Sequence, residues 1–318
     1  MVAEVPLYRD RPAAAGAIRP TSADWLAQVP AVGKRELRRG LPEVARARAS
    51  GSATPAMRSE QVTLLATSGT TADRLPSDLG VVVVGPAGAR GHAPERADRA
   101  RSMQAGEYRE AVLTTPACGA GTCHFGSQTA EERSIDGMLF FNESADPTHW
   151  TDGECDRMLG RVGEFAPRGV EADPAYLAII ARAAAAARHA LPPPEFVTLT
   201  YETTTRAMRR DVAAQRLDAP LYQLYGATEA GVLFMECEHG RLHPNERHGH
   251  IDLAPLPGSG RLARVLVTTL GREWMPLLRY DIGDVVRVAG VARMRVRPCE
   301  RRPAARAHRR ARRATASR

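Results

Sequence analysis

The residue types best suited to chemistry gather in one short segment, residues 225–231, whose sequence is Tyr-Gly-Ala-Thr-Glu-Ala-Gly. Gly226 lets a backbone approach a ligand closely, the Thr228 hydroxyl can donate to a phosphate oxygen, and the Glu229 carboxylate can hold a hard cation such as Mg²⁺. The segment follows the apolar, strand-like residues 220–224, and open α/β sheets bind ligands where such strands end. Taken alone, residues 225–231 are more simply a tight turn with an exposed acid.

A second segment offers a loop of hydrogen-bond donors. Residues 67–71 have the sequence Thr-Ser-Gly-Thr-Thr and follow the apolar run at residues 62–66. Hydroxyls on both sides of a glycine suit the oxygens of a polyphosphate. The candidate contacts are Ser68, Gly69, Thr70 and Thr71. Without other information, this segment is an ordinary loop rich in Ser and Thr.

A third segment ends in a carboxylate. Residues 279–284 follow the strand-like residues 262–270 and place Asp284 directly after Gly283, where we expect a turn. The carboxylate of Asp284 can accept two hydrogen bonds from a ribose diol. By itself, this segment too is usually only a turn.

Together, and in this order, the three segments resemble the motifs of the adenylate-forming (acyl-CoA synthetase) superfamily. The resemblance implies that residues 67–71 form its phosphate loop, residues 225–231 its adenine and Mg²⁺ motif, and Asp284 its ribose contact. The opening residues 1–47 resemble those of phenylacetate–CoA ligase-type members. The resemblance therefore implies that ATP, Mg²⁺ and CoA bind, and that a small carboxylic acid, expected to be an aryl acid, becomes an acyl-adenylate and then a CoA thioester.

The resemblance also assigns roles to single residues. Tyr225 would flank the adenine, and Thr228 and Glu229 would be catalytic, through the phosphate and through Mg²⁺. His124 lies in a region that is near the acyl pocket of related ligases and would meet the substrate carboxylate. An ordinary histidine at the end of a strand is an equal alternative. Glu202, which ends a predicted strand, would border the nucleotide site.

The chain departs from the family pattern after the phosphate loop. The family continues with Gly, a variable residue, Pro and a basic residue, whereas this chain continues with Ala72, Asp73 and Arg74. Asp73 would place a negative charge near the departing pyrophosphate. We therefore expect a weaker grip on the β- and γ-phosphates.

Four further residues suggest a metal site. Cys237, His239 and His243 lie within seven residues, and Cys299 lies downstream. Two Cys and two His complete a tetrahedral Zn²⁺ shell, and some phenylacetate–CoA ligase relatives hold a structural zinc at similar positions. A bare cysteine and two surface histidines are an equal alternative.

The superfamily also has a small C-terminal lid domain. Its catalytic lysine neutralises charge as the carboxylate attacks the α-phosphate, and such electrostatic help is usually a large part of catalysis. The only lysine here is Lys34, and the sequence ends soon after Asp284. We therefore expect the lid to be missing. The alternative function is a truncated, non-catalytic nucleotide-binding remnant of such a ligase.

The net charge of +8 belongs to the end of the sequence. Residues 293–318 hold eleven arginines and one glutamate, which is +10, so the other residues sum to −2. A basic tail attracts polyanions non-specifically. A nucleic-acid-associated protein would rest on this tail alone, so we expect no specific nucleic-acid partner. The sequence does not indicate an oligomeric state.

The composition also bears on the compartment. No apolar run reaches about 18 residues, so we expect no membrane span. The first residues have no signal-peptide pattern. The cysteines are odd in number and scattered, which favours a reducing cytoplasm over a disulfide framework. They are Cys118, Cys123, Cys155, Cys237 and Cys299.

Strand-like and helical patterns alternate from residue 108 onward, which predicts an α/β fold with parallel-rich sheets packed with helices. We expect strands at residues 109–115, 138–141 and 195–201, and helices at residues 156–165, 174–191 and 203–217. The resemblance implies that residues 1–290 form one AMP-binding ligase N-terminal domain. Residues 75–108 are expected to be irregular, and the Arg/Ala-rich residues 291–318 are expected to be disordered.

Overall fold

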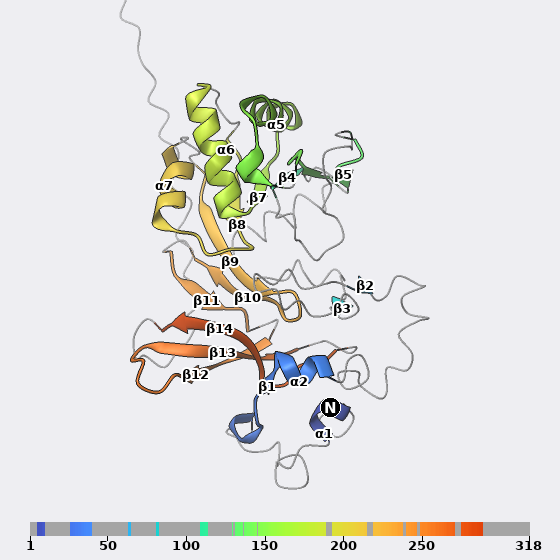
Figure 1. The fold of residues 1–318 in the computed structure, drawn as a ribbon, viewed down its shortest axis with the longest axis vertical. Helices are drawn as coiled ribbons and strands as arrows, with labels where there is room; N and C mark the ends of the chain where they lie inside the picture. Colours follow the sequence, from blue (N-terminus) through green and yellow to red (C-terminus); the bar gives the residue numbers. More distant parts are fainter. Residues whose placement is uncertain are drawn as a thin grey trace, which may run out of the picture.

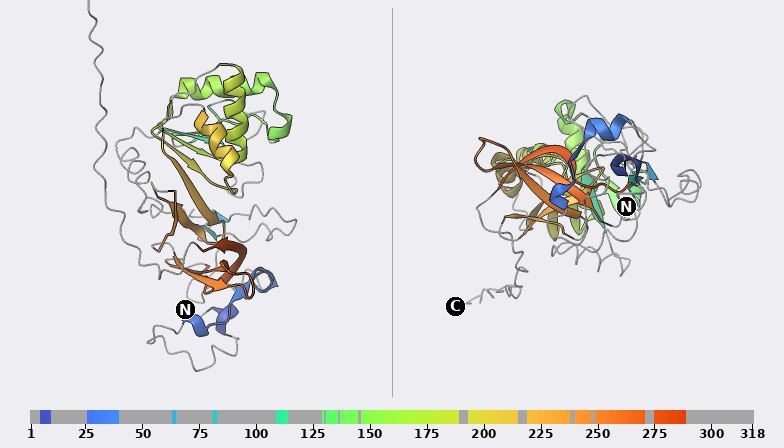
Figure 2. Two further views of the ribbon diagram at one scale, coloured as in Figure 1. Left: turned by 90° about the vertical axis from the view of Figure 1, so that its left-hand side faces the viewer. Right: turned by 90° about the horizontal axis from the view of Figure 1, so that it is seen from below.

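The structure, a computed structural model, covers most of the second half of the chain and parts of the first. It describes residues 5–9, 26–39, 63–64, 81–82, 109–113, 129, 131–135, 137–144, 146–188, 193–214, 219–237, 240–246, 249–270 and 275–288. The expected α/β class is confirmed. A larger sheet with its helices lies at one end and a smaller sheet with the N-terminal segment at the other, and β9 and β10 extend between them (Figure 1; Figure 2, left).

The larger sheet has eight strands in the order β11-β10-β9-β8-β7-β4-β6-β5. Its middle strands, β9, β8, β7, β4 and β6, run parallel, whereas β10, β11 and β5 are antiparallel to their neighbours. The strands are β4 (Glu110–Leu113), β5 (Ser134–Ile135), β6 (Met138–Phe140), β7 (Gly169–Ala172), β8 (Phe196–Leu199), β9 (Leu221–Ala227), β10 (Gly231–Glu236) and β11 (Leu242–Pro244). Parallel strands place their carboxyl ends at one edge, so the segments that follow β6, β7, β8 and β9 share an edge.

Three helices cover one face of this sheet: α5 (Asp152–Phe165), α6 (Pro174–Ala186) and α7 (Arg206–Ala214). Apolar side chains of the helices, such as Leu159 and Ile180, are packed in one buried cluster with strand residues such as Leu113 and Val197. Burial of this kind contributes roughly 25 cal/mol per Å² of apolar surface. The helical and strand patterns that the sequence shows from residue 108 onward therefore correspond to elements that share one hydrophobic core.

Helix boundaries follow capping chemistry. Helix α5 begins at Asp152 rather than near residue 156, because Thr151 and Glu154 form a reciprocal capping box. Asp173 caps α6 as expected: its Oδ1 accepts from the backbone N–H of Ala175 at 2.8 Å and of Tyr176 at 3.3 Å. Helix α6 ends at Ala186, short of the expected residue 191.

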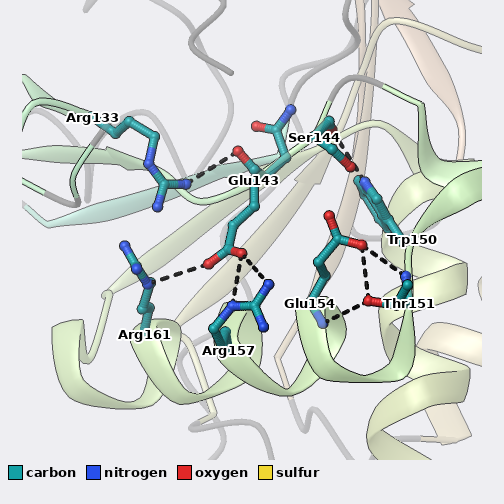
Figure 3. Close-up of polar contacts among 9 residues, drawn as sticks. Arg133, Glu143, Ser144, Trp150, Thr151, Glu154, Arg157 and Arg161 are labelled. Carbon is teal, nitrogen blue, oxygen red and sulfur yellow. Dashed lines mark hydrogen bonds and ion pairs between the residues drawn. The ribbon is translucent and has the colours of Figure 1, made fainter. Parts of the chain in front are cut away.

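The loop after β6 is fixed to α5 by charge (Figure 3). Glu143 accepts from Nε of Arg157 at 3.0 Å and lies 3.5 Å from Nε of Arg161. Arg133, which is 2% exposed, donates to the backbone oxygens of Phe140 and Asn142. These contacts therefore fix the loop after β6 both to α5 and to the segment before β5.

The smaller sheet has four strands in the order β1-β14-β13-β12. They are β1 (Val32–Gly33), β12 (Gly249–Pro255), β13 (Leu262–Thr269) and β14 (Tyr280–Arg287). Strand β1 pairs in parallel with β14, and the other two pairs are antiparallel. Two short helices, α1 (Pro6–Arg9) and α2 (Lys34–Arg39), and the 3-10 turn η2 (Leu26–Gln28) accompany this sheet.

Arg279 attaches the N-terminal segment to this sheet. Its Nη1 donates to the backbone oxygens of Ala27 at 2.6 Å and Val29 at 2.8 Å. Its Nη2 pairs with Oδ2 of Asp252 at 2.8 Å. The hydroxyl of Tyr8 accepts from the backbone N–H of Leu278 at 2.7 Å. The bonds from Arg279 to the N-terminal segment therefore join the start of β14 to residues that lie about 250 positions earlier in the sequence.

The turn expected at residues 279–284 is wrong. Residues 280–284 form the first part of β14, and Gly283 has a φ of +90° inside the strand, while Arg279 lies just before it with a φ of +46°. The pairing with β13 is irregular here, since Arg264 is opposite Val285 while Leu266 is opposite Asp281. The backbone N–H of Gly283 donates to Oδ1 of Asp281 at 3.0 Å. The turn-like composition therefore marks a bulge in a strand, not its end.

The early part of the chain is described only in pieces. Strands β2 (Thr63–Leu64) and β3 (Val81–Val82) pair antiparallel; β2 lies in the apolar run at residues 62–66 and β3 lies within residues 75–108, which were expected to be irregular. The rest of residues 75–108, and residues 291–318, lie outside the described residues. No helix in the described part of the chain is long and apolar enough to cross a membrane.

Candidate functional site

The candidate site is built on the hairpin of β9 and β10. Strand β9 pairs with β8 through its first residues and with β10 through its last. Residues 228–230 form the turn, and the backbone N–H of Ala230 donates to the oxygen of Ala227 at 2.9 Å. Thr228 is half-buried in this turn, while Glu229 is only 5% exposed. The strand predicted before Tyr225 is confirmed, and it continues to Ala227.

A partly buried ion pair holds the base of the hairpin. Nη2 of Arg209, on α7, lies 2.6 Å from Oε2 of Glu236, on β10. The same carboxylate oxygen accepts from the backbone N–H of Gln223, on β9, at 2.8 Å. Because Glu236 is 6% exposed whereas the Arg209 side chain is 30% exposed, removal of Arg209 would leave the buried Glu236 charge without its ion-pair partner.

Gly226 has a structural reason to be glycine. A Cβ at this position would lie 2.6 Å from the backbone oxygen of Gly231 and 3.2 Å from the Cα of Val232. The close approach that the sequence predicted is therefore made by the neighbouring strand β10. Gly226 is also exposed, so its other side is open to a ligand.

Tyr225 joins the second motif to the third. Its hydroxyl donates to Oδ2 of Asp284, on β14, at 2.6 Å. Burial raises the pKa of Tyr225, and the adjacent Asp284 raises it further, so the hydroxyl stays a donor. The ring of Tyr225 lies 5.5 Å from that of Phe234. Asp284 itself is exposed and keeps acceptor capacity for a second donor.

Glu229 makes the reciprocal contact. Its Oε1 accepts from the hydroxyl of Tyr280, at the start of β14, at 3.0 Å. Tyr280 is fully buried, and burial followed by the Glu229 charge raises its pKa. The structure thus brings Tyr225, Glu229 and Asp284 together through hydrogen bonds between β14 and the hairpin. The sequence alone gives Tyr280 no role, because the direction of its side chain follows only from its position at the start of β14.

Several predicted residues are not placed. Ser68, Gly69, Thr70, Thr71 and His124 lie outside the described residues, as do His239 and Cys299. Glu202 is described and exposed, and follows β8 after Thr200 and Tyr201. It follows the strand next to β9 in the larger sheet, at the same edge as the hairpin turn.

Asp173 has an additional property that the capping pattern did not reveal. It is fully buried, and its Oδ2 has no hydrogen-bond partner in the described part of the chain. Burial raises its pKa from 3.8 to about 6, and Glu202 adds to the rise. A carboxyl group that is largely protonated near pH 5 therefore lies at the carboxyl end of β7.

Two of the four predicted zinc ligands lie side by side. Sγ of Cys237 and Nε2 of His243 are 3.3 Å apart. Ligands at the usual Zn–S and Zn–N distances on two tetrahedral corners would be roughly 3.5 Å apart. Within the described ranges no cluster of three His, Cys, Asp or Glu residues could hold a metal ion, so this pair stands alone there.

Glu229 fits Mg²⁺ by chemistry. Its carboxylate is a hard oxygen donor, and the Thr228 hydroxyl is next to it in the turn. Mg²⁺ is usually bound through one or two carboxylates together with substrate phosphates and water. A single acid such as Glu229 is therefore sufficient where a bound nucleotide supplies the phosphates.

Sequence comparison gives no match: no family model matches the chain, and no curated protein matches it significantly. Solved structures do match. The open conformation of a 2-hydroxyisobutyryl-CoA ligase, in complex with 2-HIB-AMP and CoA, has a TM-score of 0.59 and 16% identity over 89% of this chain. The same ligase in its postadenylation state has a TM-score of 0.59 and 15% identity. The chain spans 65% and 59% of the length of these two structures. The fold is therefore that of an adenylate-forming CoA ligase.

Proposed function

We propose that this chain binds ATP and Mg²⁺, activates a small carboxylic acid as an acyl-adenylate, and passes the acyl group to CoA. The observation that carries the proposal is the contact between Tyr225 and Asp284, 2.6 Å long. It joins the segments that the resemblance assigns to adenine and to ribose. A chain that folds around one nucleotide requires such convergence, whereas unrelated turns do not.

The described residues have distinct roles in this proposal. Asp284 would accept from the ribose hydroxyls, with Tyr225 keeping the carboxylate in place. Thr228 would donate to the α-phosphate, and Glu229 would hold Mg²⁺. The ion, when bound, would neutralise charge on the phosphates. By the resemblance, residues Ser68, Gly69, Thr70 and Thr71 would bind the β- and γ-phosphates, and His124 would orient the acid.

The chemistry proceeds in two displacements. A carboxylate oxygen of the acid attacks the α-phosphorus of ATP, the bond to pyrophosphate breaks, and the mixed anhydride forms. The thiolate of CoA then attacks the acyl carbon, the acyl–phosphate bond breaks, and AMP leaves. Both steps build negative charge on oxygen, so oriented donors such as Thr228 would lower the barrier.

The substrate class is proposed from two sources that differ. The resemblance to phenylacetate–CoA ligases favours an aryl acid. The 2-hydroxyisobutyryl-CoA ligase, one of the proteins whose structures match this chain, is in complex with 2-HIB-AMP, the adenylate of a small hydroxy acid. A panel with both classes of acid is therefore required.

Nucleotide binding without catalysis is the second candidate. It is favoured by the sequence itself, since Lys34 is the only lysine and lies at the start of α2. Lys34 belongs to the N-terminal segment, whereas the family's catalytic lysine belongs to the C-terminal lid domain.

A structural zinc ion forms a further part of the proposal. Cys237, His239, His243 and Cys299 would supply the four ligands. The distance between Cys237 and His243 supports it. A closed shell of this type would stabilise the turn between β10 and β11.

Calorimetry and a pyrophosphate assay test the proposal together. We expect Mg-ATP to bind, and one class of acid to trigger pyrophosphate release. Asp284→Asn should weaken binding at least tenfold, while Asp156→Asn, an exposed position on α5, serves as the matched control. Binding without release by any acid would favour the second candidate. No binding of ATP or AMP would contradict both.

A further inference from the structure

Glu229 occupies a position unusual for an acid that must meet a ligand. It lies in the turn between β9 and β10, yet it is only 5% exposed. Its Oε1 accepts from the Tyr280 hydroxyl at 3.0 Å. The proposed metal ligand is therefore fixed from the protein side by a phenol that lies 51 residues further along the chain.

Tyr280 is itself held firmly. Its side chain is fully buried in the core that joins the hairpin to the smaller sheet. Its backbone is paired on both sides, with Val32 of β1 and with Val267 of β13. The neighbouring Arg279 is bonded to the N-terminal segment through the oxygens of Ala27 and Val29. The Tyr280 hydroxyl therefore has a nearly fixed position. The Glu229 carboxylate keeps its hydrogen bond to this hydroxyl only in a narrow range of orientations.

A fixed donor limits the carboxylate in two ways. It removes rotation about the last bond of the Glu229 side chain, and it occupies one lone pair of Oε1. Groups that orient a metal ligand in this manner typically change metal affinity 10- to 100-fold when they are removed. The carboxylate would otherwise pay the entropy of ordering when the ion binds.

We infer that Tyr280 is a positioning residue, which holds the Glu229 carboxylate in the orientation that receives the divalent cation. This inference rests on the proposed function, since it takes Glu229 as the metal ligand. It adds a residue that neither the motif resemblance nor the comparisons assign.

The second tyrosine contact strengthens the geometry. Tyr225 on the hairpin donates to Asp284 on β14, while Tyr280 on β14 donates to Glu229 in the hairpin turn. Two bonds in opposite directions fix the turn against the strand. The distance between Glu229, which would bind the cation, and Asp284, which would bind the ribose, would therefore stay constant.

The test compares Tyr280→Phe with a matched control, Tyr8→Phe. Tyr8 is 1% exposed in the same core, and its hydroxyl accepts from the backbone N–H of Leu278. Both variants lose one buried hydroxyl, and Tyr280→Phe loses the hydroxyl that donates to Oε1 of Glu229. The Mg²⁺ concentration that half-saturates ATP binding is measured by calorimetry for wild type and both variants. The affinity for AMP without metal, and the melting temperature, are measured beside it.

We expect Tyr280→Phe to raise the half-saturating Mg²⁺ concentration about tenfold and to leave the AMP affinity within about twofold. Tyr8→Phe should leave both unchanged. Tyr280→Met, whose unbranched side chain can fill the same space, repeats the test should the phenylalanine variant fail to fold.

Three other outcomes would overturn the inference, and they distinguish its failure from failure of the proposed function. An unchanged Mg²⁺ requirement in Tyr280→Phe overturns it and leaves the proposed function standing. Equal loss of AMP and Mg-ATP binding, with a lowered melting temperature, makes Tyr280 a structural residue only. Absence of any nucleotide binding in wild type overturns the inference and the proposed function together.

Discussion

At the scale of single residues, the account depends on carboxylates whose surroundings decide what they do. Glu229 and Asp284 each accept from a tyrosine hydroxyl, at 3.0 and 2.6 Å. Asp173 caps a helix while its other oxygen is buried without a partner in the described residues. A hydrogen bond to a charged group contributes about 1.5–3 kcal/mol, so each of these contacts is measurable.

The contact between Tyr225 and Asp284 predicts a coupling energy. Tyr225→Phe and Asp284→Asn should each destabilise the free protein, and the double variant should cost less than the sum. Because Asp284 is exposed and its charge is screened by solvent, we expect a coupling of only about 1 kcal/mol. A double-mutant cycle in urea measures it. Strict additivity would show that the contact does not form in solution.

Asp173 predicts a dependence of stability on pH. Its folded pKa of about 6 lies above the ordinary value of 3.8, so the folded state binds the proton more tightly than the unfolded state. The stabilisation of the folded state by protonated Asp173 is complete below about pH 4 and is lost as the pH rises to about 6. The shift corresponds to about 3 kcal/mol.

The matched variant is Asp173→Asn, which keeps a capping side chain and cannot ionise. Between pH 4 and 6, its unfolding free energy relative to wild type should rise by up to the same amount. Urea unfolding at several pH values measures this. Parallel curves for the two proteins would contradict the raised pKa.

At the scale of elements, the hairpin of β9 and β10 is the part that must not move. It is fixed at its base by Arg209 and Glu236, and at its turn by Tyr280. Gly226 lets the two strands approach closely.

Gly226→Ala should therefore destabilise the protein, because its Cβ would lie 2.6 Å from the oxygen of Gly231, which belongs to backbone and cannot turn aside. We expect a loss of about 2 kcal/mol, typical of overpacking. Gly160→Ala, in α5 with nothing within 4 Å of the added atom, should instead stabilise by about 0.5–1 kcal/mol. Thermal unfolding compares the two, and equal effects would refute the strand contact.

The turn between β10 and β11 predicts bound zinc. The purified protein should hold close to one equivalent, and Cys237→Ser should remove it, because a hydroxyl is a poor ligand for this ion. Elemental analysis gives the content, with Cys155→Ser, a buried cysteine on α5, as control. A metal-free wild type would leave Cys237 and His243 as a plain hydrogen-bonded pair.

At the scale of the whole molecule, the sequence correctly predicted the helices and strands that depend on local sequence patterns. The capped helix α6 and the strands around Val112 and Val197 were found because periodicity and caps are short-range properties. Strand β14 was mistaken for a turn, since Gly283 and its flanking acids have the composition of a loop. The bond from Tyr280 to Glu229 could not be predicted, because it depends on how two sheets pack.

The candidate site, too, was predicted from the sequence only in part. Residue types suggested Glu229 and Asp284, because nucleotide chemistry demands hydroxyls and acids, and the family resemblance added Tyr225. Their convergence required the fold, in which β14 passes beside the hairpin turn and the N-terminal segment fixes it there. Asp173 was recognised only as a cap, since burial of its second oxygen has no local pattern.

The central claim is that residues 225–231 and residues 280–284 hold the same nucleotide molecule. Hydrogen–deuterium exchange with and without Mg-ATP tests it most directly. The account predicts that ATP slows exchange in both segments together, with the same concentration dependence, while α5 is unchanged. Protection of one segment without the other, or of neither at saturating ATP, would contradict it.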